Sequence, residues 1–161
     1  MSTTRRNDWL PTWEKLQSVT EHLRRETGRS LTQQVNLSQP EFTVLAHLAP
    51  AADGMRPSAC ARAIGWDTSR LSHQLRRLER RGYVLRSSGG AADGRATVVR
   101  LSDEGRRTYR RALGPHLRAA EHWFGAALSE EQLVALSDVL EALALHIDRE
   151  SAATENPEES S

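Results

Sequence analysis

The sequence contains very little cysteine and lysine, and it has no long apolar run. Cys60 is the only cysteine among the 161 residues, which excludes an internal disulfide framework and a zinc site built from several thiolates. No apolar segment approaches the roughly 20 residues that a transmembrane helix needs. No apolar stretch follows the two arginines near the N-terminus, as it would in a signal peptide. We therefore expect a protein of the reducing cytoplasm that does not enter a membrane.

The sequence patterns of common enzyme sites are also missing. There is no G-x-S-x-G nucleophile elbow, no phosphate-binding loop ending in GKS or GKT, and no H-E-x-x-H zinc motif. His116 and His122 are six residues apart, a spacing that does not place both on one face of a helix. We interpret Cys60 as a small buried apolar residue. We therefore expect neither an enzyme nor a cofactor or metal site, and metal or redox sensing is the less favoured alternative.

Positive charge is concentrated in the middle of the chain, although the whole chain carries a net charge of only +1. The segment from Arg56 to Arg111 holds 14 Arg and 5 Asp or Glu, a net charge of +9, and the rest of the chain carries −8. Lys15 is the only lysine. The planar fork of arginine suits phosphate groups and guanine edges. A basic segment between acidic arms indicates a module that binds a polyanion.

Apolar spacing, capping residues and turn residues predict a mainly α chain with one β-hairpin. Ser38 to Glu41 and Ser129 to Gln132 have the pattern of capping boxes, and Gly82 has the position of a helix-ending glycine. In chain order, the predicted elements are helices over about 10–28, 38–49, 57–64 and 67–81, strands over 83–88 and 96–101, and helices over about 102–127 and 129–150. The order is that of a winged helix-turn-helix flanked by further helices. The predicted organisation is an N-terminal dimerisation helix (1–36), a DNA-binding winged helix-turn-helix (37–101), C-terminal dimerisation helices (102–150) and a disordered acidic tail (151–161).

The segment DTSRLSHQLRRLERRGY carries the strongest functional signal. Leu71, Leu75 and Leu78 repeat with helical spacing and define an inner face. The outer face then carries hydroxyls, a histidine and arginines, and no acidic residue occurs between Asp67 and Glu79. Such side chains can donate and accept hydrogen bonds at base edges and phosphates. The predicted DNA contacts are Thr68, Ser69, Arg70, Ser72, His73, Arg76 and Arg77 on this helix, and Arg95 at the tip of the hairpin.

Two other interpretations of the basic helix remain open. An arginine-rich amphipathic helix is often only a solvated surface. A helical protein-interaction module or anti-repressor would use the flanking helices without reading DNA directly. The adjoining hairpin favours DNA binding, because Arg86, Arg95 and Arg100 surround a glycine-rich tip that can enter a minor groove.

The stretch from Phe42 to Arg106 resembles the MarR family of bacterial transcriptional regulators. The resemblance is carried by WDTSRLSHQLRRLERRGYV (66–84) and by DGRATVVRLSDEGR (93–106). In the second segment, Asp93, Arg95 and the Leu-Ser-x-x-Gly helix start ending at Gly105 match the family's pattern. The resemblance implies a homodimer on a pseudo-palindromic operator in double-stranded DNA, repression by occlusion, and release by a small, often phenolic, ligand.

Residues on the terminal helices and at their junction with the predicted winged helix-turn-helix, which we call the reading head (37–101), are the candidates for a dimer interface and an effector site. Apolar residues of the terminal helices, among them Trp9, Leu10, Trp13, Trp123 and Phe124, indicate an interface between two subunits, with closure of a single chain's own core as the alternative. For a small aromatic effector we predict a pocket at Trp13, Phe42 and His47, because aromatic walls with one polar group suit such a ligand. Plain core packing explains each of these three residues equally well.

Overall fold

The computed structural model describes residues 8–88 and 97–155. It divides into two compact units, residues 1–123 and 124–161. The first unit contains five α-helices and a two-stranded antiparallel sheet, so the predicted class, mainly α with a small hairpin, is confirmed. Its elements are α1 (Leu10–Val35), α2 (Gln39–Leu48), α3 (Pro57–Ile64), α4 (Thr68–Arg80), β1 (Val84–Ser88), β2 (Thr97–Leu101) and α5 (Asp103–Trp123).

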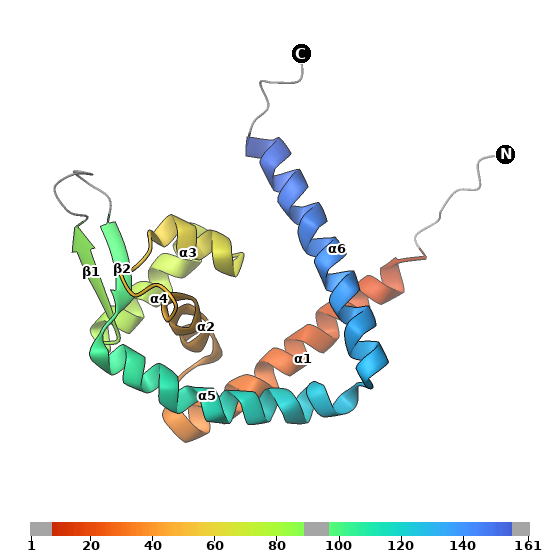
Figure 1. Cartoon of the computed structure of the whole chain (residues 1–161), viewed down its shortest axis with the longest axis horizontal. Helices are drawn as coiled ribbons and strands as arrows, with labels where there is room; N and C mark the ends of the chain where they lie inside the picture. The colour runs from red at the N-terminus through yellow and green to blue at the C-terminus, as the bar shows by residue number, and fades with distance from the viewer. Residues whose placement is uncertain (1–7, 89–96, 156–161) are drawn as a thin grey trace, which may run out of the picture. The chain divides into compact units, whose positions relative to one another are not determined.

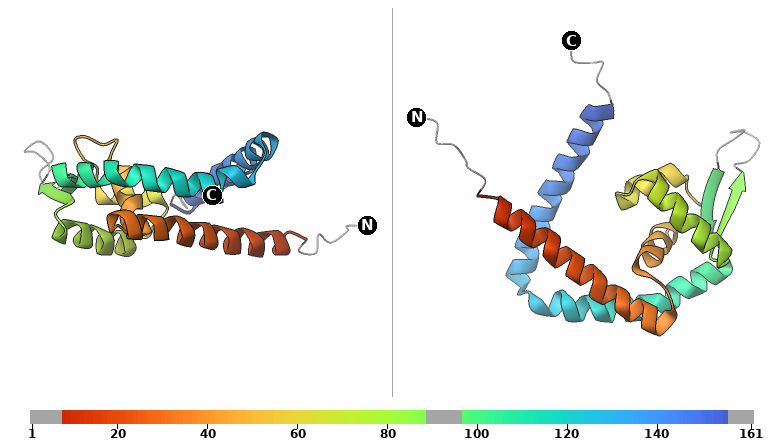
Figure 2. Two further views of the ribbon diagram at one scale, coloured as in Figure 1. Left: turned by 90° about the horizontal axis from the view of Figure 1, so that it is seen from below. Right: turned by 180° about the vertical axis from the view of Figure 1, so that it is seen from behind.

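The two long helices of the first unit, α1 and α5, lie side by side and carry the smaller elements at one end (Figures 1 and 2). There α2 packs against α3, α4 and both long helices. The core at this end consists of aliphatic side chains from all of these elements. Leu31 of α1, Leu45 of α2, Leu75 of α4 and Leu101 of β2 are all fully buried or nearly so.

Local signals set the ends of the short helices. The side chain of Ser38 accepts from the N–H of Glu41, and the Glu41 carboxylate accepts from the N–H of Ser38, which confirms the predicted capping box of α2. Gly65 ends α3 in the left-handed conformation with φ of 74°. Helix α1 is longer than expected, because it continues past Gly28 to Val35.

The hairpin pairs Val84 with Leu101 and continues outward to Ser88 and Thr97. A third backbone segment joins the middle of β2, because Met55 and Val99 exchange two N–H···O bonds of 2.9 Å. The sequence pattern predicted only a loop here. Gly54, with φ of +89°, makes this approach possible, since a Cβ at that position would lie 2.8 Å from the Val99 carbonyl oxygen.

The second unit contains a short 3₁₀ turn, η1 (Gly125–Ala127), and the helix α6 (Glu130–Glu155). The N–H of Ser129 donates to the Gln132 side chain and the N–H of Gln132 donates to the Ser129 hydroxyl, which confirms the second capping box. Helix α6 reaches five residues into the segment predicted as a tail from residue 151. Its apolar residues Leu140, Leu143 and Ile147 are 48%, 43% and 60% exposed in the single chain.

Close packing at the start of α5 generates a stability prediction. Alanine is favoured over glycine inside a helix by about 1 kcal/mol, but a Cβ at Gly105 would overlap the backbone of Tyr83. We expect Gly105→Ala to lower the melting temperature. Gly114→Ala in the same helix is the matched control, because its Cβ would meet only the movable end of Arg118. We expect this variant to keep or raise the melting temperature. Equal effects of the two changes in thermal unfolding would contradict the role of this contact.

Candidate nucleic-acid interface

Helix α4 begins and ends at strong local signals. The Asp67 carboxylate caps the helix by accepting from the N–H of Arg70 at 2.7 Å. The hydrogen bonds from the Ser69 hydroxyl and the Arg70 N–H hold the pKa of Asp67 below its ordinary value. At the other end Gly82 adopts φ of +73°. The N–H groups of Gly82 and Tyr83 donate to the carbonyls of Glu79 and Leu78, the pattern of a Schellman motif.

The leucine stripe of α4 orients the outer face. Leu71, Leu75 and Leu78 are at most 1% exposed. Each such burial stabilises the fold by about 1.5–3 kcal/mol, so rotation of the helix about its axis is costly. The structure exposes most of the predicted contact residues, at the start of α4 and on the face away from this stripe. Exposed there are Thr68, Ser69, Arg70, His73, Arg76 and Arg77, while Ser72 is half-buried. Arg95 lies outside the described residues.

The C-terminal half of α4 lines an open hollow of about 500 Å³ with His73, Arg76, Glu79 and Arg80. Glu79 is not free, because it accepts a 2.6 Å ion-paired hydrogen bond from Arg86 of β1. Among residues 8–88 and 97–155, Arg76 and Arg80 form no ion pair. Their charges are therefore available to an external anion.

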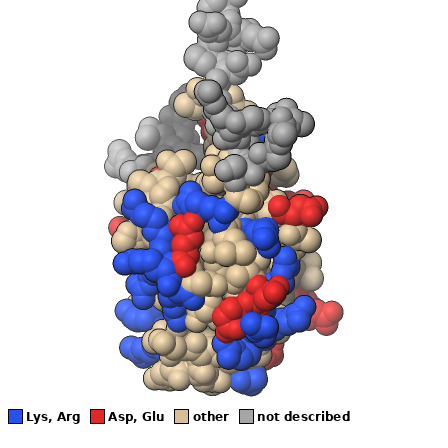
Figure 3. All heavy atoms as spheres, turned by 90° about the vertical axis from the view of Figure 1, so that its left-hand side faces the viewer, with Lys and Arg blue, Asp and Glu red and all other residues tan. Residues whose placement is uncertain are grey.

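Figure 3 shows the side of the molecule that carries the hairpin. Lys and Arg side chains form a band along one edge of this face, and Asp and Glu are gathered into a few separate patches. This distribution agrees with the charge asymmetry of the sequence. A surface of this kind attracts a polyanion through its summed potential.

Arg77 has a second role that the sequence analysis missed. Its Nε donates at 3.0 Å to the carboxylate of Glu41 on α2, and Arg81 Nη1 donates to the same oxygen at 2.9 Å. Glu41 is completely buried. Its other oxygen accepts from the backbone N–H and the hydroxyl of Ser38, both at 2.9 Å. We call Glu41, Arg77 and Arg81 the Glu41 cluster.

The Glu41 cluster extends to the chain segments just before α2 and just after α4. Arg81 also donates to the carbonyl of Asn36 at 2.7 Å and to the Tyr83 hydroxyl at 3.2 Å. Burial alone would raise the pKa of Glu41, but the hydrogen bonds from Ser38 and Arg81 outweigh it, so the pKa lies below its ordinary value. The side chain is thus an ionised carboxylate that fixes the end of α4 against the start of α2. The signal in the sequence was the four-residue spacing of Arg77 and Arg81, which places both on one helical face.

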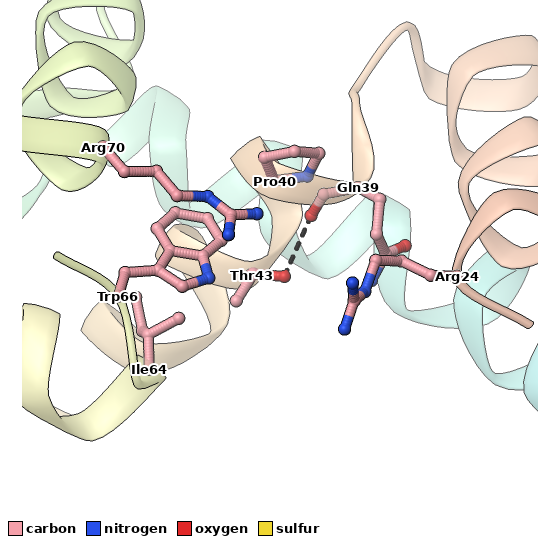
Figure 4. A pocket seen from close by; sticks show the side chains of 7 residues that line it. All are labelled: Arg24, Gln39, Pro40, Thr43, Ile64, Trp66 and Arg70. Carbon is pink, nitrogen blue, oxygen red and sulfur yellow. Dashed lines mark hydrogen bonds between the residues drawn. The ribbon is translucent and has the colours of Figure 1, made fainter. Parts of the chain in front are cut away.

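The predicted effector residues occupy three different environments. Trp13 is 48% exposed on α1. Phe42 is in the core, where its ring centroid lies 4.3 Å from that of His116. His47 is half-buried, and its Nδ1 lies 2.8 Å from the Thr43 carbonyl oxygen of its own helix. Neither the hollow on α4 nor a smaller cavity of about 150 Å³ between α1 and the start of α4 (Figure 4) includes any of the three predicted residues.

The cysteine and histidine side chains do not form a reactive or metal-binding cluster in the described part of the chain. Cys60 is fully buried, and burial raises the pKa of its thiol. Burial also disfavours the charged form of His116, which lowers the pKa of its imidazole. In the described part of the chain, no three His, Cys, Asp or Glu side chains gather as they would around a metal ion. None of its helices combines the length and apolar content needed to cross a bilayer.

Comparison with known proteins identifies the reading head and the whole fold. A family model described as the IclR helix-turn-helix domain matches residues 42–88, which span α2 to β1. No curated protein sequence matches the chain. Among solved structures, AbsC, a MarR family transcriptional regulator from Streptomyces coelicolor, is 26% identical with a TM-score of 0.80, and the match covers 91% of this chain and 99% of AbsC.

Two further solved structures show the same arrangement. Sco3205 from Streptomyces coelicolor, a MarR family regulator solved in complex with DNA, is 24% identical with a TM-score of 0.79, covering 89% of this chain and 90% of Sco3205. CouR from Rhodococcus jostii RHA1, solved bound to p-coumaroyl-CoA, is 22% identical with a TM-score of 0.73, covering 89% of this chain and 96% of CouR. The chain is therefore a winged helix-turn-helix protein. Its fold is that of the MarR family of transcriptional regulators, which confirms the resemblance found in the sequence.

The Glu41 cluster predicts a pH-dependent stability. We expect Glu41→Gln to lower the free energy of unfolding at pH 7 by about 1–3 kcal/mol, because a buried charged hydrogen-bond acceptor is lost. The native pKa of Glu41 is depressed, so this stabilisation is present above the ordinary glutamate pKa of about 4.3 and disappears as the pH falls through the native pKa. The gap between wild type and variant in urea unfolding should close in acid.

Glu104→Gln is the matched control for this experiment. Glu104 also pairs with two arginines, Arg107 and Arg111, but its side chain is 44% exposed. Exposed pairs contribute little, so we expect a change below about 1 kcal/mol at pH 7. A Glu41→Gln variant as stable as Glu104→Gln at neutral pH would show that the cluster does not fix α4.

Proposed function

We propose that this protein is a MarR-type transcriptional regulator that acts in the cytoplasm as a repressor, binding a pseudo-palindromic operator in double-stranded DNA. The observation that carries the proposal is the exposed face of α4, rich in arginine and free of acidic residues from Thr68 to Leu78, on a helix whose opposite face is fixed by the core. The DNA complex of Sco3205, a protein of the same fold, supports this function.

The geometry of α4 suits the major groove of B-DNA. In helix-turn-helix proteins the second helix of the motif enters the groove with its N-terminal residues at the base edges. Here that end carries Thr68, Ser69 and Arg70, followed by His73 and Arg76 at helical spacing. Arginine can hold guanine O6 and N7 with two hydrogen bonds, and hydroxyls can serve phosphates or either kind of base. We infer that Arg76 contacts base edges, while Arg77 uses part of its guanidinium on Glu41 and presents the rest to the backbone.

Arg76 gives the direct test of DNA reading. We expect Arg76→Gln to weaken binding to a duplex selected from a random pool by about tenfold or more, because a bidentate base contact is worth about 1–3 kcal/mol. Arg110→Gln, which removes one exposed charge from α5 instead, is the control. Fluorescence anisotropy measures both affinities, and circular dichroism confirms that both variants fold. Unchanged binding by Arg76→Gln would remove the helix from the interface and favour a protein-interaction module.

We further propose that two copies associate through the terminal helices. Large apolar side chains of the terminal helices are exposed in the single chain: Trp9 at the N-cap of α1 at 61%, Trp13 of α1 at 48% and Ile147 of α6 at 60%. A stripe with this many exposed apolar residues is unusual on a monomer and typical of an interface. Two reading heads about 34 Å apart would match successive half-sites of an operator, which gains specificity that one head does not have.

Leu143, at 43% exposure on α6, tests the dimer. Light scattering should give the wild type twice the 18.0 kDa mass of one chain. We expect Leu143→Glu to shift the mass toward one chain and to lose high-affinity operator binding, because a charge would be buried at the interface. Ser137→Glu, at an exposed polar position of the same helix, should keep the dimer. A wild-type mass of one chain at micromolar concentration would refute the proposal.

A small effector that releases the protein from DNA completes the proposed function. The structure of CouR with p-coumaroyl-CoA supports ligand control in a protein of this fold. Trp13, Phe42 and His47 remain our predicted residues for an aromatic ligand. The partners of the protein are then an operator duplex, a second copy of itself and a small molecule, and no step of this function requires a cofactor or catalysis.

A further inference from the structure

Glu79 is an acidic residue in the middle of a basic surface. It lies in the last turn of α4 and lines the open hollow together with His73, Arg76 and Arg80. Among the described residues that line this hollow, Glu79 alone is acidic. Its position three residues after Arg76 places both side chains on one face of the helix. A carboxylate here repels the phosphates of a duplex that approaches the hollow, so it opposes the binding that the neighbouring arginines favour.

The charge of Glu79 is directed to the hairpin and not to its own helix. Its Oε1 accepts a 2.6 Å hydrogen bond from Nε of Arg86 on β1. Arg76 and Arg80 form no ion pair in the part of the chain that the structure describes. The Glu79 and Arg86 side chains are 28% and 37% exposed, so the pair is partly shielded from water. The carboxylate therefore compensates one particular cation, Arg86, and leaves those of α4 available.

The hairpin fixes Arg86 beside the hollow. Arg86 lies in the middle of β1, opposite the completely buried Val99, and β1 packs against α4. Because Glu79 lines the hollow and its carboxylate contacts Arg86, the guanidinium lies next to the same space. An arginine fork suits phosphate oxygens. Without Glu79, Arg86 would therefore join the cations that face an approaching duplex.

A phosphate gains little by displacing Glu79 from Arg86. A partly exposed ion pair is weak in itself. Displacement, however, leaves the Glu79 carboxylate without its counterion and next to the same phosphate. The new attraction is then offset by a new repulsion. At the interface the two residues therefore act as one neutral unit.

We propose that Glu79 is an internal counterion that withholds Arg86 from the DNA backbone, and so lowers the affinity of this surface for duplexes of every sequence. The inference rests on the proposed function, because it requires α4 to meet DNA. Phosphate contacts supply essentially all of the affinity for non-specific DNA, whereas base contacts distinguish one sequence from another. Lowering the shared phosphate term limits retention of the protein on the large excess of non-operator sites.

Glu79→Gln tests the proposal, because it removes the charge and keeps the size of the side chain. We expect it to tighten binding to the selected duplex and to a scrambled duplex of equal length alike, by severalfold at about 50 mM salt. Arg86, once released, adds one phosphate contact, so the slope of log affinity against log salt should steepen by about 0.9. The gain should then shrink by about threefold between about 50 and about 200 mM salt. Fluorescence anisotropy measures the affinities, and circular dichroism confirms that the variant folds.

The double variant, Glu79→Gln with Arg86→Gln, identifies the source of the gain. It removes both members of a neutral unit, so we expect the affinity and the salt slope of the wild type. A double variant that binds as tightly as Glu79→Gln would show that the gain does not come from Arg86. One that binds more weakly than wild type would show that Arg86 contacts DNA in spite of the pair. Either result would overturn the proposal.

Glu121→Gln is the matched control for charge. It removes one negative charge in the last turn of α5, at the end of that helix far from the hairpin (Figure 1). We expect it to leave both duplex affinities and the salt slope unchanged. A steepening equal to that of Glu79→Gln would assign the effect to net charge and overturn the role of the Glu79–Arg86 pair.

NMR tests the pair itself without DNA. The Nε–H signal of Arg86, assigned with Arg86→Gln, should exchange with water more slowly in the wild type than in Glu79→Gln, because the carboxylate accepts this N–H. Equal exchange rates would show that Glu79 does not hold Arg86 in solution, and would overturn the inference whether or not the protein binds DNA.

The remaining results of the Glu79→Gln titration separate this inference from the proposed function. An unchanged or shallower salt slope would reduce the pair to a structural link between α4 and the hairpin. A loss of affinity for the selected duplex alone would show that Glu79 reads a base, as a carboxylate can at cytosine N4. Both results overturn this inference and leave the proposed function standing. A wild type that binds neither duplex removes the proposed function and this inference with it.

Discussion

Burial of the leucine stripe on α4 is the constraint on which the interface depends. Leu71, Leu75 and Leu78 face the interior, so His73 and Arg76 between them face solvent, while Arg77 is exposed but also reaches the buried Glu41. The direction in which these charges face therefore follows from apolar packing and not from any attraction among the charges themselves. Repulsion between neighbouring arginines is tolerated because the core stabilises the helix by more than the repulsion costs.

The Glu41 cluster shows how the same arginine-rich helix is held at its end. One buried carboxylate receives two guanidiniums and a capping serine, so α2, α4 and the segment before α2 meet at a single group. Breaking such a buried pair leaves a charge without compensation, which makes the arrangement rigid even where its net contribution to stability is modest. Under the proposed function, this fixed point places α4 precisely, as base contacts require because they are sensitive to small displacements.

Much of the fold was accessible from the sequence because its signals are local. The capping boxes at Ser38 and Ser129 and the terminal glycine Gly82 depend on a few neighbouring residues, and the structure confirms all three. The outward placement of Arg70 and Arg76 followed from helical periodicity alone. Contacts between distant segments were not accessible in this way. Nothing in the spacing of Glu41 and Arg77, 36 residues apart, shows that they pair, and the cavity between α1 and α4 depends on packing that no local pattern encodes.

The two hydrogen bonds between Met55 and Val99 have a mechanical consequence. They tie the middle of β2 to the segment that leads into α3, with Gly54 permitting the backbones to come that close. A force that a bent or widened groove applies to the hairpin is therefore transmitted through these two hydrogen bonds to the segment that leads into α3. Under the proposed function, a change in the shape of the duplex at the hairpin is therefore transmitted to the helix-turn-helix motif as well.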